Sequence, residues 1–285
     1  MRAYGVILAA SLLLLSAPGE ANQLLGPIWR QGANSVVVTL CAPGGDHDES
    51  CRAAALRIRG QTRPLGSGYI IVRVMPVAGA KRGQPAVTVL GDNGGSGGEG
   101  DFFAIVPAPH PIVGRLTGER MDSIVFHPHA GRLALDLPFN IEFFNGAPHA
   151  GVSIVPLPIL WAGDDFAVDM AALTRRRVDM RYATVIVRQD LGRWAQEQPD
   201  PNDHHAGSGT PAAVEALTGL ILSGHADVAR AVLHKGWPTG RPGERRFWNA
   251  LSAAVVRHPW WARFGLDRLP HAAMVLAAAR GPAAG

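Results

Sequence analysis

The sequence has only two cysteines among 285 residues, and it lacks the motifs that mark the common classes of enzyme. No Gly-x-Ser-x-Gly elbow joins an expected strand to an expected helix, no His-Glu-x-x-His occurs, and no Gly-Lys-Ser/Thr follows a glycine-rich loop. Such motifs mark α/β-hydrolases, zinc proteases and P-loop nucleotide-binding proteins. The sequence therefore carries no standard signature of nucleophilic, zinc-protease or nucleotide chemistry.

A strong excess of positive charge is also absent. Lysine and arginine number 27 against 23 acidic residues, and the only run of arginines covers residues 175–177. Surfaces that bind nucleic acids cluster basic residues and interleave them with aromatic ones. We therefore expect no nucleic-acid partner, and we interpret the arginine run as a solvated helix face.

Outside the N-terminus, no hydrophobic run reaches the roughly twenty residues that are needed to span a bilayer. The N-terminus itself has a positive charge at Arg2, an apolar stretch over residues 6–15 and a small-x-small sequence that ends at Ala21. This pattern is typical of a secretory signal peptide, here residues 1–21. We expect cleavage near Ala21, a mature chain without a membrane span, and a periplasmic or secreted location.

The two cysteines fit an exported protein. Cys41 and Cys51 enclose a polar, turn-rich loop, and in an oxidising compartment such a pair predicts a disulfide. The alternative is a metal site that uses the acidic residues and the histidine of the loop. The spacing of the cysteines does not match that of zinc ligands, so we favour the disulfide.

Short β-strands with turns between them dominate the first part of the chain. The 34 glycines and 22 prolines favour such a structure. β-Branched or alternating segments predict strands, and they cover residues 36–40, 69–74, 86–90, 102–106, 122–126, 133–135, 139–143, 152–161 and 166–168. Pro156 and Pro158 restrict their strand to an edge or irregular position.

Helical patterns dominate the end of the chain. Thr210 and Pro211 predict a helix start, and apolar residues recur at helical spacing from there to about residue 279. We expect an α+β fold, an antiparallel β domain (a sandwich or an open propeller-like sheet) followed by a C-terminal helical region. The expected layout is a signal peptide at 1–21, a mainly β domain at 22–197, a Pro- and Gly-rich linker at 198–209 and a helical region at 210–285.

The glycine-rich run at residues 91–101 is the first candidate binding site. Asp92, Asn93, Glu99 and Asp101 offer oxygen ligands on a flexible backbone, which suits calcium. The run occurs once and departs from the repeated calcium-binding nonapeptides of β-helices. A long exposed loop is the structural alternative.

Histidines supply the second candidate. His127 and His129 lie close together on a turn, and we expect His149 and Asp136 to come within reach if the strands pair. Two histidines and a carboxylate can hold zinc with an open position for water. The histidines of this chain are otherwise scattered, so structural roles compete with this interpretation.

Tryptophans are the third candidate. Trp237, Trp248, Trp260 and Trp261 can line an aromatic ligand cleft or anchor helices to a core, and we favour the core.

Several segments resemble exported bacterial proteins with a β domain related to FG-GAP or VCBS propeller blades. They are GDNGGSGGEGDF at 91–102, LDLPFNIEFF at 135–144 and ILWAGDDFAVD at 159–169, with a helical tail at 217–238 and 245–251. The resemblance implies a bladed β domain and names no activity. The Asp-x-Asp-Gly calcium loop of those blades is missing here, so the resemblance does not imply calcium.

The sequence as a whole predicts a non-enzymatic role in binding an unknown protein or envelope component, without a required cofactor. The alternative is a metal-dependent periplasmic hydrolase that uses His127 and His129.

Overall fold

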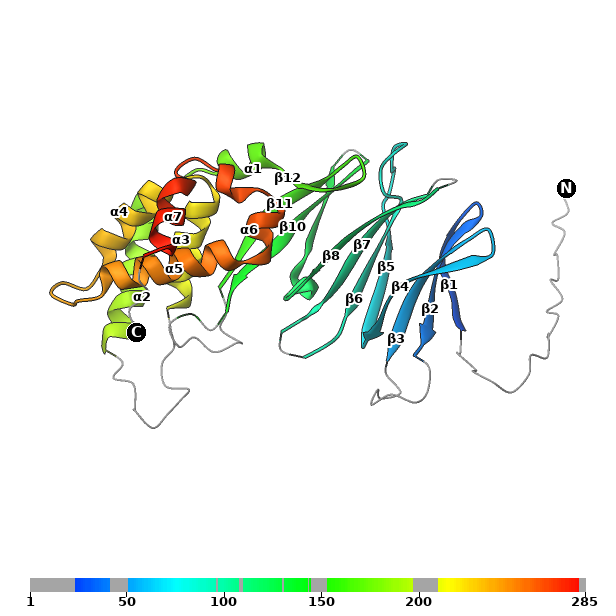
Figure 1. The fold of residues 1–285 in the computed structure, drawn as a ribbon, viewed down its shortest axis with the longest axis horizontal. Helices are drawn as coiled ribbons and strands as arrows, with labels where there is room; N and C mark the ends of the chain where they lie inside the picture. The colour runs from blue at the N-terminus through cyan, green and yellow to red at the C-terminus, as the bar shows by residue number, and fades with distance from the viewer. Residues whose placement is uncertain are drawn as a thin grey trace, which may run out of the picture.

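Three four-stranded antiparallel sheets and a group of helices make up the protein (Figure 1). The structure is a computed structural model that describes residues 24–41, 51–95, 97–107, 110–129, 131–142, 144, 153–196 and 210–281. The first sheet contains β1 (Leu24–Gln31), β2 (Asn34–Leu40), β3 (Arg52–Ile58) and β4 (Gln61–Tyr69). The second contains β5 (Ile71–Pro76), β6 (Val87–Asp92), β7 (Gly100–Val106) and β8 (Ile112–Gly118), and the third contains β9 (Val125–His129), β10 (Arg132–Ile141), β11 (Ser153–Ala162) and β12 (Asp165–Val168).

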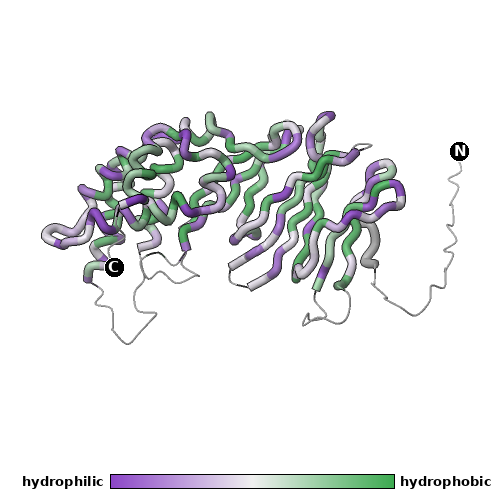
Figure 2. Tube along the Cα trace, viewed as in Figure 1, coloured by the Kyte–Doolittle hydropathy of each residue, from purple (hydrophilic) through white to green (hydrophobic). Residues whose placement is uncertain are grey.

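Each sheet is a meander, in which strands that follow one another in the chain are neighbours. The three meanders are stacked one after another, with the helices beyond the third sheet (Figure 1). Hydrophobic residues follow the strands and helices, and hydrophilic residues gather at the turns (Figure 2). The α+β class and the antiparallel β domain with C-terminal helices are therefore confirmed.

The two central strands of the second sheet, β6 and β7, are buried on both faces. All residues of β6 and β7 are buried, and neighbouring residues of β7 enter different cores. Phe102 packs into the core shared with the third sheet and the helices, whereas Phe103 packs into the core shared with the first sheet. This two-sided burial explains the continuous apolar run at residues 102–106, because successive side chains of a strand point to opposite faces.

Tyr69 connects the first two sheets. Its hydroxyl donates to Oδ2 of Asp101 at 2.6 Å, and its ring lies where a Cβ at Gly66 or Gly91 would collide with it. Burial and the bond to Asp101 raise the pKa of Tyr69, so the hydroxyl stays a donor. Gly66 and Gly91 therefore make room for the buried ring of Tyr69.

Pro156 and Pro158 lie in β11 where only one side of the strand is paired. β12 pairs only with residues 159–162 of β11, while the two prolines face β10 on the other side. A missing N–H on the unpaired side breaks no ladder hydrogen bond. The expected edge position is thus correct for this half of the strand, although β11 as a whole lies between β10 and β12.

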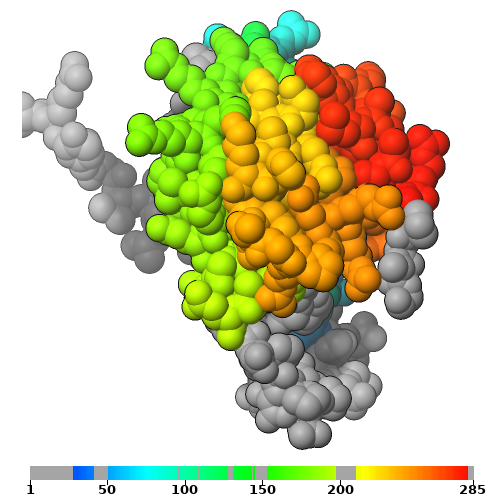
Figure 3. Space-filling model, turned by 90° about the vertical axis from the view of Figure 1, so that its left-hand side faces the viewer, coloured from blue at the N-terminus to red at the C-terminus, as the bar shows by residue number. Residues whose placement is uncertain are grey.

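The helices begin soon after the last strand. They are α1 (Met170–Thr174), α2 (Met180–Gln196), α3 (Pro211–Leu222), α4 (Ala226–Gly236), α5 (Glu244–Arg257), α6 (Pro259–Arg263) and α7 (Ala272–Ala279). Seen from their end of the molecule, α2, α3, α4 and α7 lie side by side and cover the sheets (Figure 3). The expected β domain at 22–197 therefore includes α1 and α2, and α2 packs against α3 and α4.

One core joins the helices to the sheets. It extends from Phe102 in β7 through Leu137 in β10 to Leu217 in α3 and Leu251 in α5. The start of α3 is also fixed across this unit. Thr210 precedes the helix as expected, but its hydroxyl makes no cap hydrogen bond, and Asp190 of α2 instead accepts from the backbone N–H of Ala213 at 2.9 Å.

Cys41 and Cys51 form the expected disulfide, with their Cα atoms 5.4 Å apart. The bond joins the end of β2 to the start of β3 and closes the loop between them.

Residues 122–126 do not form one strand, in contrast to the prediction. Arg120 has a φ of 55°, and a 3-10 turn follows at Met121–Ser123 before β9 begins. Tyr69 and Ile71 similarly belong to two strands of different sheets, so the expected strand at 69–74 is divided. The predicted signal peptide and linker lie outside the described residues. Within the described part of the chain, no helix is long and apolar enough to cross a membrane.

Candidate functional site

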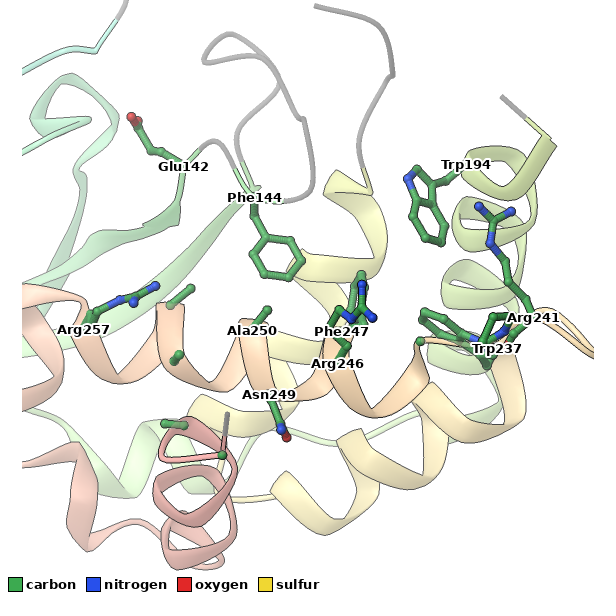
Figure 4. Close-up of a pocket in the computed structure, with 16 residues that line it drawn as sticks. Glu142, Phe144, Trp194, Trp237, Arg241, Arg246, Phe247, Asn249, Ala250 and Arg257 are labelled. Atoms are coloured by element: carbon green, nitrogen blue, oxygen red, sulfur yellow. Dashed lines mark hydrogen bonds between the residues drawn. The ribbon is translucent and has the colours of Figure 1, made fainter. Parts of the chain in front are cut away.

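A large cavity lies where α5 meets the end of the third sheet and the other helices (Figure 4). Its volume is about 730 Å³, which is within the range of pockets that bind small molecules. Its lining comes from Glu142, Phe144, Trp194, Trp237, Arg241, Pro242, Gly243, Arg246, Phe247, Asn249, Ala250, Ala253, Ala254, Arg257, Ala279 and Gly281.

One face of α5 forms the floor of this cavity. Arg246, Ala250, Ala253 and Arg257 recur at spacings of three or four residues, which place them on the same side of a helix. The opposite side carries Leu251 and its neighbours into the core. Small residues in the middle of the face leave space, and an arginine stands at each end.

Four aromatic rings, of which Phe247 belongs to α5 itself, form an aromatic wall of the cavity. Phe144 packs edge-on against Phe247 with ring centroids 5.2 Å apart, and Trp237 lies 5.6 Å from Phe247 and 6.2 Å from Trp194. Figure 4 shows Phe144 and Trp194 above α5. The four rings come from three distant parts of the chain, and together they give the cavity a mostly apolar surface.

Arg241 fixes the far end of the aromatic wall. Its guanidinium lies 4.4 Å from the ring centroid of Trp194 and donates to the carbonyl of Ala195 at 2.7 Å. The backbone carbonyl of Arg241 in turn accepts from Nε1 of Trp237 at 2.8 Å. A cation over an indole ring is a favourable arrangement that also holds both groups in place.

The charge of the cavity is positive. Arg241, Arg246 and Arg257 line it together with a single acid, Glu142. Glu142 is itself engaged, because its Oε1 accepts from Nδ2 of Asn140 at 3.2 Å and lies 3.8 Å from Nε of Arg120. An anion with an apolar body therefore matches both the charge and the surface of the cavity.

A second cavity, of about 360 Å³, adjoins the first at Glu142. Asn140 lines this cavity and is buried. The amide nitrogen of Asn140 donates to Glu119 at 2.9 Å as well as to Glu142, and its oxygen lies 3.4 Å from Nε2 of His258. The amide thus holds two carboxylates on the wall of one cavity.

His258 completes this network as a neutral side chain. Burial lowers its pKa to about 4. Its Nδ1 accepts from the backbone N–H of Trp260, so the remaining proton belongs on Nε2 and is directed at Asn140. The ring also stacks on Phe139 with centroids 3.9 Å apart. His258 therefore caps α6 and orients Asn140.

The glycine-rich run forms the β6–β7 connection, and its acidic residues are engaged in different ways. Asp101 accepts from Tyr69, from Thr117 and from both Nε and Nη2 of Arg115. Asp92 accepts from the backbone N–H of Gly94 at 2.7 Å. Asn93 and Glu99 are exposed and line the second cavity with Asp101. The carboxylate of Asp101 is thus occupied by protein donors.

His127 lies on β9 with its Nε2 2.9 Å from Oδ2 of Asp136, as the expected strand pairing required. His129 is at the end of the same strand, opposite Arg132, and His149 lies outside the described residues. Among the residues that the structure describes, no three or more His, Cys, Asp or Glu side chains are placed to hold a metal ion. The zinc and calcium sites stay predictions.

The tryptophans divide between core and cavity. Trp248, Trp260 and Trp261 are buried, as expected of core residues, and Trp260 also borders the second cavity. Trp237 instead lines the large cavity. Sequence reasoning missed Phe144, Trp194 and Arg241, because no local pattern connects these distant segments.

No family model, curated protein or solved structure matches this chain. The resemblance to FG-GAP and VCBS blades therefore still rests on the sequence segments alone.

Proposed function

We propose that this chain is an exported, non-enzymatic binding protein, and that the large cavity holds an anionic ligand with an apolar body. The observation that carries the proposal is the combination of three arginines with an aromatic wall in one cavity of about 730 Å³. Charge-assisted hydrogen bonds from guanidinium groups suit a carboxylate or phosphate, and the rings and alanines suit apolar groups.

The composition of the lining supports binding over turnover. Among the described lining residues, Glu142 is the single acid, and there is no serine, cysteine, histidine or lysine. Glu142 is held by Asn140 and Arg120, so the cavity itself presents no group placed as nucleophile or free general base.

Export is supported by two features. The N-terminal segment has the pattern of a signal peptide. The disulfide fits an oxidising compartment, because cytosolic proteins rarely keep such bonds. An envelope location would give the protein access to peptides, lipids and other amphiphilic anions.

A fluorescence titration tests the proposal, since Trp194 and Trp237 border the cavity. The probe is N-acetyl-Gly-Phe-Leu with a free carboxylate, and its C-terminal amide is the uncharged comparison. We expect the acid to bind at least about tenfold more tightly than the amide, which corresponds to about 1.4 kcal/mol.

An arginine variant tests whether the arginines of the cavity cause the preference for the acid. Arg246→Ala with Arg257→Ala removes both exposed cations of the cavity, and the affinity for the acid should fall to that of the amide. Arg245→Ala is the matched control, because Arg245 is exposed on the same helix and does not line the cavity. Equal affinities for acid and amide in the unmodified protein, or absence of binding, would contradict the proposal.

A further inference from the structure

We infer that the ligand is a zwitterion, a short peptide with free termini, whose carboxylate lies among the arginines and whose ammonium group lies in the adjoining acidic cavity. This inference rests on the proposed function and adds a second contact to it. It follows from the wall that the cavities share and from their opposite charges.

Glu142 joins the two cavities, because its side chain lines both. It is held there by Asn140 and Arg120, and its side chain is only 10% exposed. A ligand that extends past Glu142 leaves the aromatic, arginine-lined space and enters the second space directly. The two cavities therefore adjoin at a fixed acid that borders both of them.

The second cavity is acidic. Glu99, Asp101, Glu119 and Glu142 line it, and among the described residues of its lining there is no lysine or arginine. Two cations lie nearby, and each is paired: Arg115 with Asp101 and Arg120 with Glu142.

This pairing leaves the charges of Glu99 and Glu119 uncompensated. In the described part of the chain, no ion pair joins either residue to a cation, and the hydrogen bond of Glu119 comes from the neutral amide of Asn140. His258 adds no positive charge near neutral pH, because its pKa lies at about 4. An ammonium group supplies both the charge and the N–H donors that these carboxylates lack.

The separation of positive and negative charge between the two cavities also favours one orientation of a bound peptide. A peptide bound with its C-terminus at Arg246 and Arg257 meets opposite charge at both ends, whereas the reverse orientation brings like charges together. Like-charge contacts disfavour the wrong orientation, and attractive contacts favour the right one. The aromatic wall lies on the arginine side of Glu142, so apolar side chains are expected near the C-terminal end of the peptide.

The test compares Gly-Phe-Leu with its N-acetyl and C-terminal amide forms in the same fluorescence titration. We expect N-acetylation to weaken binding at least about tenfold, separately from the loss caused by the amide. In the Glu99→Gln, Glu119→Gln variant, the free and acetylated peptides should bind equally. Asp164→Asn, in the exposed β11–β12 turn, controls for the change of net charge.

The outcomes separate the two proposals. Equal binding of free and acetylated peptides, with weak binding of the amide, overturns the zwitterion and leaves the anionic site standing. Binding of none of the three overturns both. If Glu119→Gln unfolds the protein, the comparison of free and acetylated peptides on the unmodified chain tests the zwitterion. Glu99→Gln alone then replaces the double variant, because Glu99 is exposed.

Discussion

The contact between the first two sheets and the contact between the sheets and the helices are built differently. Tyr69, Phe103 and Ile105 fill the first contact, and glycine at Gly66 and Gly91 lets the tyrosine ring approach the backbone. The second contact shares a large core, but it leaves cavities of about 730 and 360 Å³ around Glu142. Close packing is the rule in protein interiors, and the proposed binding site lies at the contact that departs from it.

The two contacts also differ in the polar and charged groups that they contain. At the sheet contact, the described polar network centres on Asp101, which accepts from Tyr69 and Arg115 and also borders the second cavity. The helical contact carries arginines, carboxylates and a buried neutral histidine at the edges of open space. The residues of the proposed binding site thus lie where the helices meet the sheets.

The largest expected effect comes from opening a cavity in the closely packed core between the second and third sheets. Phe102 is fully buried between the rings of Phe126 and Phe166, at centroid distances of 5.6 and 5.8 Å. Phe102→Ala should lower the free energy of unfolding by about 3–5 kcal/mol, because it removes apolar contacts and leaves a cavity. Urea unfolding measures it, with Tyr182→Ala at an exposed site as control. A loss below about 1 kcal/mol for Phe102→Ala would contradict the tight packing of this sheet.

Lowering the pH should lower the free energy of unfolding, because His258 is partly buried at the contact between the helices and the sheets. Its pKa is about 4 in the folded protein against an ordinary value of 6.5, so between these values the unfolded chain binds more protons. The histidine's contribution to stability is fully present above about pH 6.5 and declines as the pH falls towards 4. The total change is on the order of 3 kcal/mol.

Denaturation at a series of pH values tests this contribution. His258→Asn cannot titrate and can still cap α6, so it should flatten the dependence between pH 4 and 6.5. Glu119 and Glu142 reach His258 only through the neutral Asn140, and both remain in the variant. An unchanged slope in His258→Asn would assign the effect to these carboxylates instead.

Local patterns predicted the elements of the fold well. The alternation at residues 139–143 and 152–161 predicted two neighbouring strands, and Pro156 and Pro158 marked the half of β11 that lacks a second partner. Pro211 and the apolar spacing after it predicted α3. These features succeed because strand alternation, proline geometry and helix starts are local properties of the chain.

The site was less predictable because it depends on tertiary contacts. Arg241 stacks on Trp194 across 47 positions of sequence, and Asn140 reaches His258 across 118. Neither pair has a motif. The 3-10 turn at Met121–Ser123, which follows the positive φ of Arg120, was also missed, because no sequence pattern marks it. The charged and aromatic residues of the sequence thus indicated which kinds of groups are present, but not which of them lie close together in the fold.

Opening the disulfide should have a smaller effect, confined to the sheet end. Cys41→Ala with Cys51→Ala releases a loop with a sequence separation of 10 residues, which on the chain-entropy model costs about 2–3 kcal/mol. Peptide binding at the helical end should stay within about twofold of the unmodified protein, because the bond joins β2 to β3. Urea unfolding and the fluorescence titration are measured on the same sample. A large loss of affinity would show that the two ends are coupled.

The smallest effect on stability should come from filling the hollow contact. Ala250 is exposed on the cavity floor in α5, and Ala250→Leu adds apolar volume there without disturbing a packed neighbour. Leucine is nearly as good a helix former as alanine, so the free energy of unfolding should change by less than about 0.5 kcal/mol. The affinity for Gly-Phe-Leu should nevertheless fall at least about tenfold, because the side chain occupies the space of the ligand. Ala277→Leu, at an exposed position of α7 that does not line the cavity, should leave both quantities unchanged. Unaltered binding by Ala250→Leu would place the ligand away from α5, and a loss of stability of several kcal/mol would mean that this contact is as closely packed as that between the sheets.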